Sequence, residues 1–67
     1  MTEAEELEQL LIPDLVNKAV TLKKEKTTIV VDHISVDTLR NKLVLILFCK
    51  DNRRYQFNLD TFANQIL

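Results

Sequence analysis

The residues best suited to chemistry on a partner are basic and aromatic side chains grouped near position 52. They are Lys50, Arg53, Arg54 and Tyr55. Such cations bind phosphates, and an aromatic ring stacks on an unpaired base. However, the net charge of the chain is −1 and Asp51 lies within the group. We therefore expect mainly solvated charges here, with contact to nucleic acid or to an acidic protein segment as the alternative.

A catalytic pair is the second candidate, because an imidazole can activate a thiol nucleophile. His33 and Cys49 are the only histidine and cysteine of the chain. Cys49 ends an apolar stretch, where cysteine usually serves as a small hydrophobic residue. The chain contains no glycine from which a tight oxyanion turn could be built. We therefore predict no catalytic residues and a protein that is not an enzyme.

A metal site is the third candidate, suggested by the neighbours Asp32 and His33. Successive residues of a strand point to opposite faces, so these two side chains should not share one ion. The acidic run from Glu3 to Glu8 fits a solvated helix face better than a paired catalytic site. We predict no metal, no cofactor and no small-molecule substrate.

The size of the chain limits how it can be stabilised. Its 67 residues allow one small domain, spanning 1–67, and a single cysteine cannot form an internal disulfide. The hydrophobic content of 46% exceeds what one thin core requires. Oligomerisation is a common way for such small domains to gain stability. Composition therefore favours self-association.

The location expected from the sequence is the cytoplasm. The amino terminus is acidic, whereas a secretory signal begins with basic residues. The longest apolar run, Leu43–Cys49, is too short for a membrane span, which needs about 20 residues. A lone cysteine also fits a reducing compartment. We expect no membrane partner.

The amino-terminal third has the pattern of a helix. Thr2 and Glu5 have the spacing of a capping box, and apolar residues recur at helical spacing as far as Val20. Pro13 should either kink this helix near Ile12 or begin a second one. We expect helix from Glu3 to about Lys24.

The rest of the chain reads as three strands and a short helix. The strands are Thr27–Ser35, Leu43–Cys49 and Arg53–Asn58, and the helix is Thr61–Leu67 with Asp60 as its cap. We expect the residues from Ser35 to Asn41 to form a connection. The alternative is a strand that continues to Leu39, with a tight turn at Arg40-Asn41.

The register of the last hairpin decides which side chains share a face. A two-residue turn at Asp51-Asn52 pairs Phe48 with Tyr55, and we favour it because it collects a uniform apolar patch. A three-residue loop instead places Tyr55 beside Leu47. In both registers the strand Leu43–Cys49 is apolar on two faces, as in a strand covered on both sides.

These observations predict an α+β fold. A kinked amino-terminal helix packs on a three-stranded antiparallel β-meander, and a short carboxy-terminal helix follows. The expected function is a non-enzymatic interaction module, either a homodimer or a subunit of a larger assembly. Its contact surface would be the stripe Leu43, Leu45 and Leu47, or the helix face carrying Leu7, Leu10 and Leu11.

Overall fold

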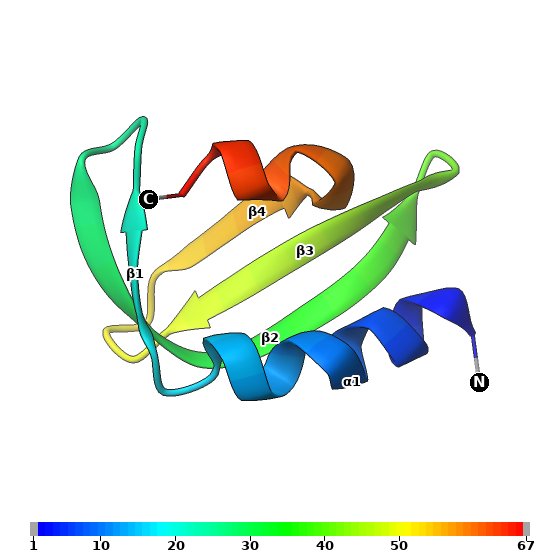
Figure 1. Ribbon diagram of the computed structural model, residues 1–67, viewed down its shortest axis with the longest axis horizontal. Helices are drawn as coiled ribbons and strands as arrows, with labels where there is room; N and C mark the ends of the chain where they lie inside the picture. The colour runs from blue at the N-terminus through cyan, green and yellow to red at the C-terminus, as the bar shows by residue number, and fades with distance from the viewer. Residues whose placement is uncertain (1, 67) are drawn as a thin grey trace.

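The computed structural model describes residues 2–66 and has an α+β fold (Figure 1). Its elements are α1 (Glu3–Leu15), β1 (Ala19–Leu22), β2 (Thr27–Leu39), β3 (Lys42–Cys49), β4 (Arg54–Asn58) and the 3-10 helix η1 (Leu59–Asn64). Four strands form one antiparallel sheet in the order β1-β2-β3-β4. The expectation of three strands was therefore wrong, and β1 is the strand that the sequence reading missed.

The first helix begins as predicted but ends early. The hydroxyl of Thr2 accepts a hydrogen bond from the amide of Glu5 at 3.2 Å, which confirms that Thr2 caps the helix. Pro13 lies inside α1, whose last residue is Leu15. Asn17 then adopts a left-handed φ of 64°, and the chain turns into β1. The prediction that the helix continues to Lys24 was wrong. The helical spacing of apolar residues up to Val20 combines the last residues of α1 with the first residues of β1, which follow a different period.

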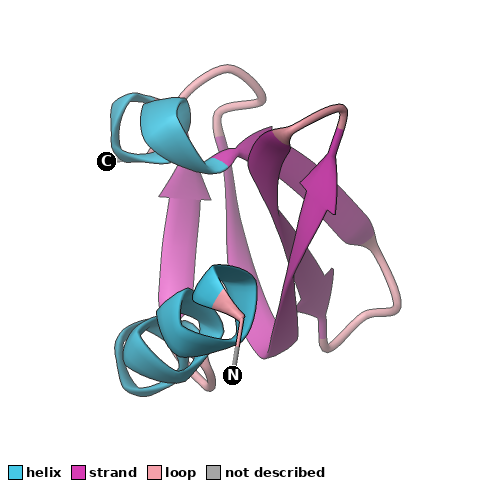
Figure 2. Cartoon of the chain, turned by 90° about the vertical axis from the view of Figure 1, so that its right-hand side faces the viewer, coloured by secondary structure: helices cyan, strands magenta, loops and turns pink. Residues whose placement is uncertain are grey.

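The long strand β2 continues to Leu39, as in the alternative prediction. The expectation that the residues from Ser35 to Asn41 form a connection was therefore wrong. Arg40 and Asn41 both have positive φ, 52° and 64°, as a two-residue hairpin turn requires. β1 pairs with the start of β2, and α1 lies along the later part (Figures 1 and 2). The sheet is thereby curled around a core that α1 and η1 complete.

The carboxy-terminal segment closes the curl on β1. Ile66 forms an antiparallel bridge with Leu22, and the amide of Lys23 donates to the carbonyl of Gln65 at 2.9 Å. The predicted helix at Thr61–Leu67 is instead the 3-10 turn η1, which starts before Asp60 and has Asn58 at its N-cap. Its Phe62 is buried, whereas Leu67 lies outside the described residues.

The β3–β4 hairpin has the three-residue loop rather than the preferred two-residue turn. Leu47 pairs with Tyr55 and Leu45 pairs with Phe57. The reason is Asn52, which adopts a φ of 72° as the left-handed residue of such a loop. The register shift exchanges the faces of β3 relative to the prediction, so the leucines, not Phe48, share a face with Tyr55.

Candidate functional site

The predicted interface stripe lies inside the core of the chain. Leu45 and Leu47 are both 0% exposed, and Leu43 is half-buried. They face the same cluster as Leu15 at the end of α1 and Phe62 in η1. The chain's own helices therefore cover this stripe, and a second subunit cannot reach Leu45 or Leu47 unless the chain unfolds.

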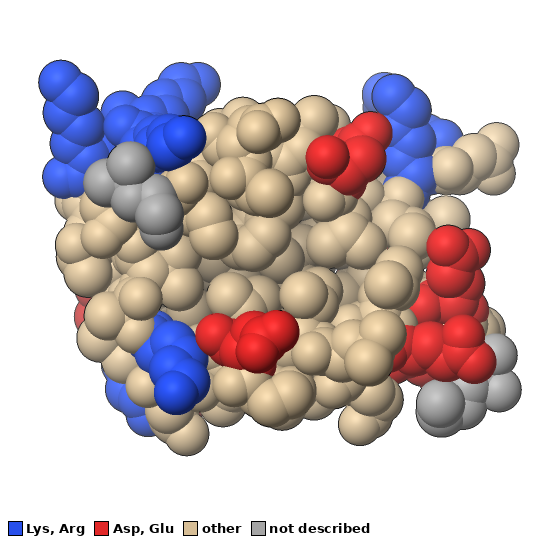
Figure 3. Space-filling view, in the orientation of Figure 1, with Lys and Arg blue, Asp and Glu red and all other residues tan. Residues whose placement is uncertain are grey.

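Leu43 is half-buried and reaches the surface between α1 and η1. It lines a shallow hollow together with Leu59, Lys42 and Glu3. Figure 3 shows acidic side chains on the face that carries α1 and η1 as well as charged side chains around its margin. On the predicted helix face, Leu10 is 69% exposed, whereas Leu11 packs against the core. The helix is thus only partly used for packing.

The opposite face of β3 carries three apolar residues outside the main core cluster, although one of them, Val44, is itself only 4% exposed. Val44, Ile46 and Phe48 alternate with the core leucines, and each is flanked by a residue of β2 and a residue of β4. The resulting rows are His33–Phe48–Arg54, Ser35–Ile46–Gln56 and Asp37–Val44–Asn58. Ile46 and Phe48 are half-buried, so this outer face is apolar along its middle and polar along both sides.

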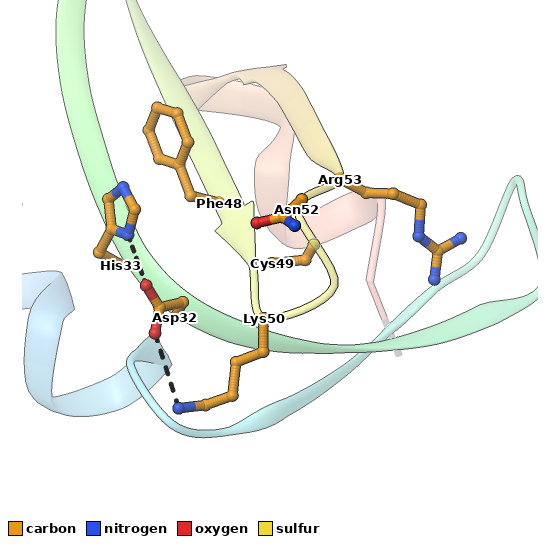
Figure 4. A pocket seen from close by; sticks show the side chains of 7 residues that line it. All are labelled: Asp32, His33, Phe48, Cys49, Lys50, Asn52 and Arg53. Atoms are coloured by element: carbon orange, nitrogen blue, oxygen red, sulfur yellow. Dashed lines mark hydrogen bonds and ion pairs between the residues drawn. The ribbon is translucent and has the colours of Figure 1, made fainter.

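A β-bulge in β2 places Asp32 and His33 on the same side of the sheet. Val31 pairs with Cys49 and His33 pairs with Phe48, which leaves Asp32 as the extra residue. Nδ1 of His33 donates to Oδ2 of Asp32 at 2.9 Å, and Nζ of Lys50 lies 3.6 Å from Oδ1 (Figure 4). The expectation that the two neighbours point apart was wrong, because the bulge breaks the alternation.

The imidazole of His33 lies flat on the ring of Phe48. The ring centroids are 4.3 Å apart and the planes differ by 10°. The side chain of His33 is nevertheless 61% exposed. The hydrogen bond to Asp32 fixes the ring edge, and this contact is also the main reason why the pKa of the Asp32 carboxyl lies below its ordinary value.

The four residues predicted as a polar contact do not form one surface. Arg53 folds onto Asp51, with Nε 2.7 Å from Oδ2, and its Nη1 donates to the hydroxyl of Tyr55 at 3.3 Å. Tyr55 packs against the core on the inner face. Lys50 forms an ion pair with Asp32, and Arg54 lies opposite Phe48 on the outer face. Tyr55 thus lies apart from Lys50 and Arg54, whereas Lys50 and Arg53 line one hollow beside His33 and Phe48.

Cys49 does not meet His33 in a catalytic arrangement. Its side chain is 6% exposed and belongs to the core cluster, whereas His33 stands on the outer face. Burial, with the nearby Asp51, raises the pKa of the thiol above its ordinary value. A thiol that stays protonated at neutral pH is a poor nucleophile.

The edges of the sheet differ in how the chain covers them. Segment 65–66 pairs with the end of β1 at Leu22 and Lys23. The carboxylate of Glu8 accepts a hydrogen bond of 2.9 Å from the amide of Val36, on the edge of β2 that faces away from β3. β4 pairs with β3 on one side. On its other side, no strand or helix within residues 2–66 hydrogen-bonds to the backbone of Arg54 or Gln56. β4 is therefore an open edge.

The backbone groups at this open edge follow from the hairpin register. The amide of Cys49 donates to the carbonyl of Arg53, so hydrogen-bonded pairs recur at every second residue of β4. Tyr55 and Phe57 consequently face β3 with their amides and carbonyls. The same groups of Arg54 and Gln56 point away from the sheet, as does the amide of Asn58, whose carbonyl accepts a hydrogen bond from the hydroxyl of Thr61 at 3.3 Å.

Other kinds of site receive no support from the described residues. Residues 2–66 contain no group of three side chains suited to binding a metal, and none of their helices is long and apolar enough to cross a membrane. Comparison of the chain with protein-family models, with curated proteins and with solved structures finds no match. Function must therefore be argued from the geometry.

Proposed function

We propose that the chain is a small, non-enzymatic, cytoplasmic interaction module that forms a homodimer by joining the β4 edges of two copies. The observation that carries this proposal is the open edge of β4, where the backbone of Arg54 and Gln56 has no hydrogen bond on the side away from β3 within residues 2–66. Segment 65–66 and Glu8, in contrast, each hold a part of the β1 and β2 edges. Unpaired edge strands are templates for pairing with another chain. Two copies joined at β4 would form one continuous antiparallel sheet.

The sequence of β4 is self-complementary when a two-fold axis passes through Gln56. The outward amide and carbonyl of Gln56 then bond with those of the second copy. Arg54 lies opposite Asn58 of the second copy, and Tyr55 lies opposite its Phe57. Like charges are thereby kept apart, and an aromatic pair forms on the inner face. A register centred on Arg54 would place two arginines opposite each other.

The edge also lacks the usual barriers to pairing. β4 contains no proline, and its register with β3 is regular over all five residues. Natural edge strands are often protected by proline, bulges or charge, and here only Arg54 serves that role. Because five residues bury little surface, we expect a weak dimer that forms at micromolar or higher concentrations.

Sedimentation equilibrium of the wild type and two Gln56 variants tests the proposal. Gln56→Pro removes the outward amide and adds a ring at the edge, but leaves the β3 ladder intact. We expect the Gln56→Pro variant to be folded, as judged by circular dichroism, and to sediment as a monomer. Gln56→Ala keeps the backbone donor and should still dimerise. A wild type that stays monomeric at high micromolar concentration, or a Gln56→Pro variant that still dimerises, would overturn the proposal.

A charge exchange tests the register. Asn58→Arg places two cations opposite each other, once on each side of the axis, and each such pair should cost about 0.2–1 kcal/mol. The dissociation constant should therefore rise about 2- to 30-fold. Adding Arg54→Glu should restore or tighten the dimer. A double variant no tighter than Asn58→Arg alone would rule out this register.

A further inference from the structure

We propose that the row His33–Phe48–Arg54, together with Lys50, binds single-stranded nucleic acid. An unpaired base would stack on the exposed face of His33, and the adjoining phosphates would contact Lys50 and Arg54. This inference shares only Arg54 with the proposed dimer, in which Arg54 lies opposite Asn58 of the second copy, whereas His33 and Phe48 belong to β2 and β3 and Lys50 follows β3. The tests on His33 and Lys50 therefore distinguish the two proposals.

The first support is the preformed aromatic platform. Phe48 backs one face of the imidazole at 4.3 Å, and Asp32 holds its Nδ1 edge at 2.9 Å. The ring is thereby oriented although 61% of the side chain is exposed. A base that stacks on its free face meets a surface that needs little further ordering. Stacking of this kind is tolerant of sequence because every base has a π-face.

The second support is the position of the cations. In the close view, Lys50 extends along Asp32 on one side of the ring pair (Figure 4). Arg54 lies directly across from Phe48 in the sheet, on the side away from His33. No ion pair of Arg54 is found within residues 2–66. A nucleic-acid strand on this face would therefore meet Lys50 beside Asp32 and Arg54 beyond Phe48.

The third support is the shape of the surface beside the rings. A shallow cavity of about 420 Å³ is lined by Asp32, His33, Phe48, Cys49, Lys50, Asn52 and Arg53. Ligand pockets commonly have volumes of about 300–1,000 Å³, and this hollow lies within that range. Arg53 points away from the rings in Figure 4, and its contact with Asp51 at 2.7 Å is closer than that of Lys50 with Asp32 at 3.6 Å. We therefore leave it out of the contact.

The test is fluorescence anisotropy with labelled single-stranded RNA and DNA of mixed sequence, titrated at several salt concentrations. His33→Ala should weaken binding about 5- to 150-fold, as removal of a stacking side chain does elsewhere. His33→Phe keeps an aromatic ring and should retain binding. Equal binding by wild type and His33→Ala, or loss in His33→Phe as large as in His33→Ala, would overturn the stacking site.

The cations have a matched control at the β1–β2 turn. Lys50→Gln and Arg54→Gln should each reduce the slope of log affinity against log salt by about 1, whereas Lys24→Gln should leave it unchanged. An equal effect of all three variants would mean unspecific attraction and would overturn the site. So would the absence of binding at low salt. Competition by a free nucleoside monophosphate as strong as by the strand would overturn a nucleic-acid ligand in favour of a nucleotide.

Discussion

Glu8 of α1 and Val36 of β2 are joined by a hydrogen bond of 2.9 Å from the backbone amide of Val36 to the carboxylate of Glu8. The contact is partly buried and satisfies an amide on the outer side of β2, where β1 no longer pairs. It fastens the amino-terminal helix to the sheet. Glu8 therefore differs from Glu3, Glu5 and Glu6, which lie exposed in the first turn.

Glu8→Ala should lower the free energy of unfolding by about 1–3 kcal/mol, because it leaves the amide of Val36 without its partner. The measurement is urea denaturation followed by circular dichroism. Glu6→Ala removes a carboxylate from an exposed position of the same helix and should change the stability by less than about 0.5 kcal/mol. Equal losses in the two variants would show that the hydrogen bond contributes nothing.

The two faces of β3 should respond differently to truncation. Leu45 is fully buried, so Leu45→Ala should lower the free energy of unfolding by about 2–5 kcal/mol. Ile46 is its half-buried neighbour on the outer face, and Ile46→Ala should cost less. Leu45→Asp should unfold the chain. A folded Leu45→Asp variant would show that Leu45 is not in the core.

The β2–β3 turn predicts a stabilising substitution. Arg40 is held at a φ of 52°, which costs a side-chain-bearing residue about 1–2 kcal/mol. Arg40→Gly relieves that cost, and the added freedom of the unfolded chain offsets about 0.5–1 kcal/mol of the gain. We expect the free energy of unfolding, measured by thermal or urea denaturation, to rise by about 0.5–1 kcal/mol. Lys42→Gly, in β3, should instead destabilise.

Much of the sheet could be predicted because β-branched and apolar residues mark its longer strands. β2 and β3 follow from Thr27–Ser35 and Leu43–Cys49, and the turn at Arg40-Asn41 was one of two readings. β1 could not be separated from the helix before it, because a four-residue strand is too short to distinguish a period of 2 from one of 3.6. Val20 fits both patterns.

The candidate site depended on features that a single sequence does not reveal. The bulge at Asp32 depends on cross-strand fit between β2 and β3, and it is what brings Asp32 beside His33. The hairpin register turned on whether Asn52 adopts positive φ. Tyr55 was the aromatic residue expected at the polar surface, yet Phe48 occupies it because the register is shifted by one.

Cys49 should be unreactive in the folded protein. Burial raises the pKa of its thiol, so little thiolate is present at neutral pH. A thiol reagent should label the native chain slowly, and labelling should become fast in denaturing urea. Rapid labelling of the native chain would show that Cys49 is accessible and would reopen its role as a nucleophile.

The contact between Asp32 and His33 predicts how the carboxylate titrates. The hydrogen bond from His33 is the main cause of the lowered pKa of Asp32, with Lys50 adding to it. Because that pKa lies below its value in an unfolded chain, about 3.9, folding favours the ionised form. The stabilisation is present above that pH and is lost as the pH falls through the folded pKa.

Carbon-13 NMR of the aspartate carboxyl groups between neutral and acidic pH measures this effect. In His33→Ala the pKa of Asp32 should rise towards its ordinary value, because the main hydrogen bond is gone. Asp51 is the internal control, since its pKa is lowered chiefly by the backbone amide of Arg53. The pKa of Asp51 should therefore not change in His33→Ala. An unchanged Asp32 titration in the variant would show that His33 does not hold the carboxylate, and the orientation of the imidazole on Phe48 would then need another cause.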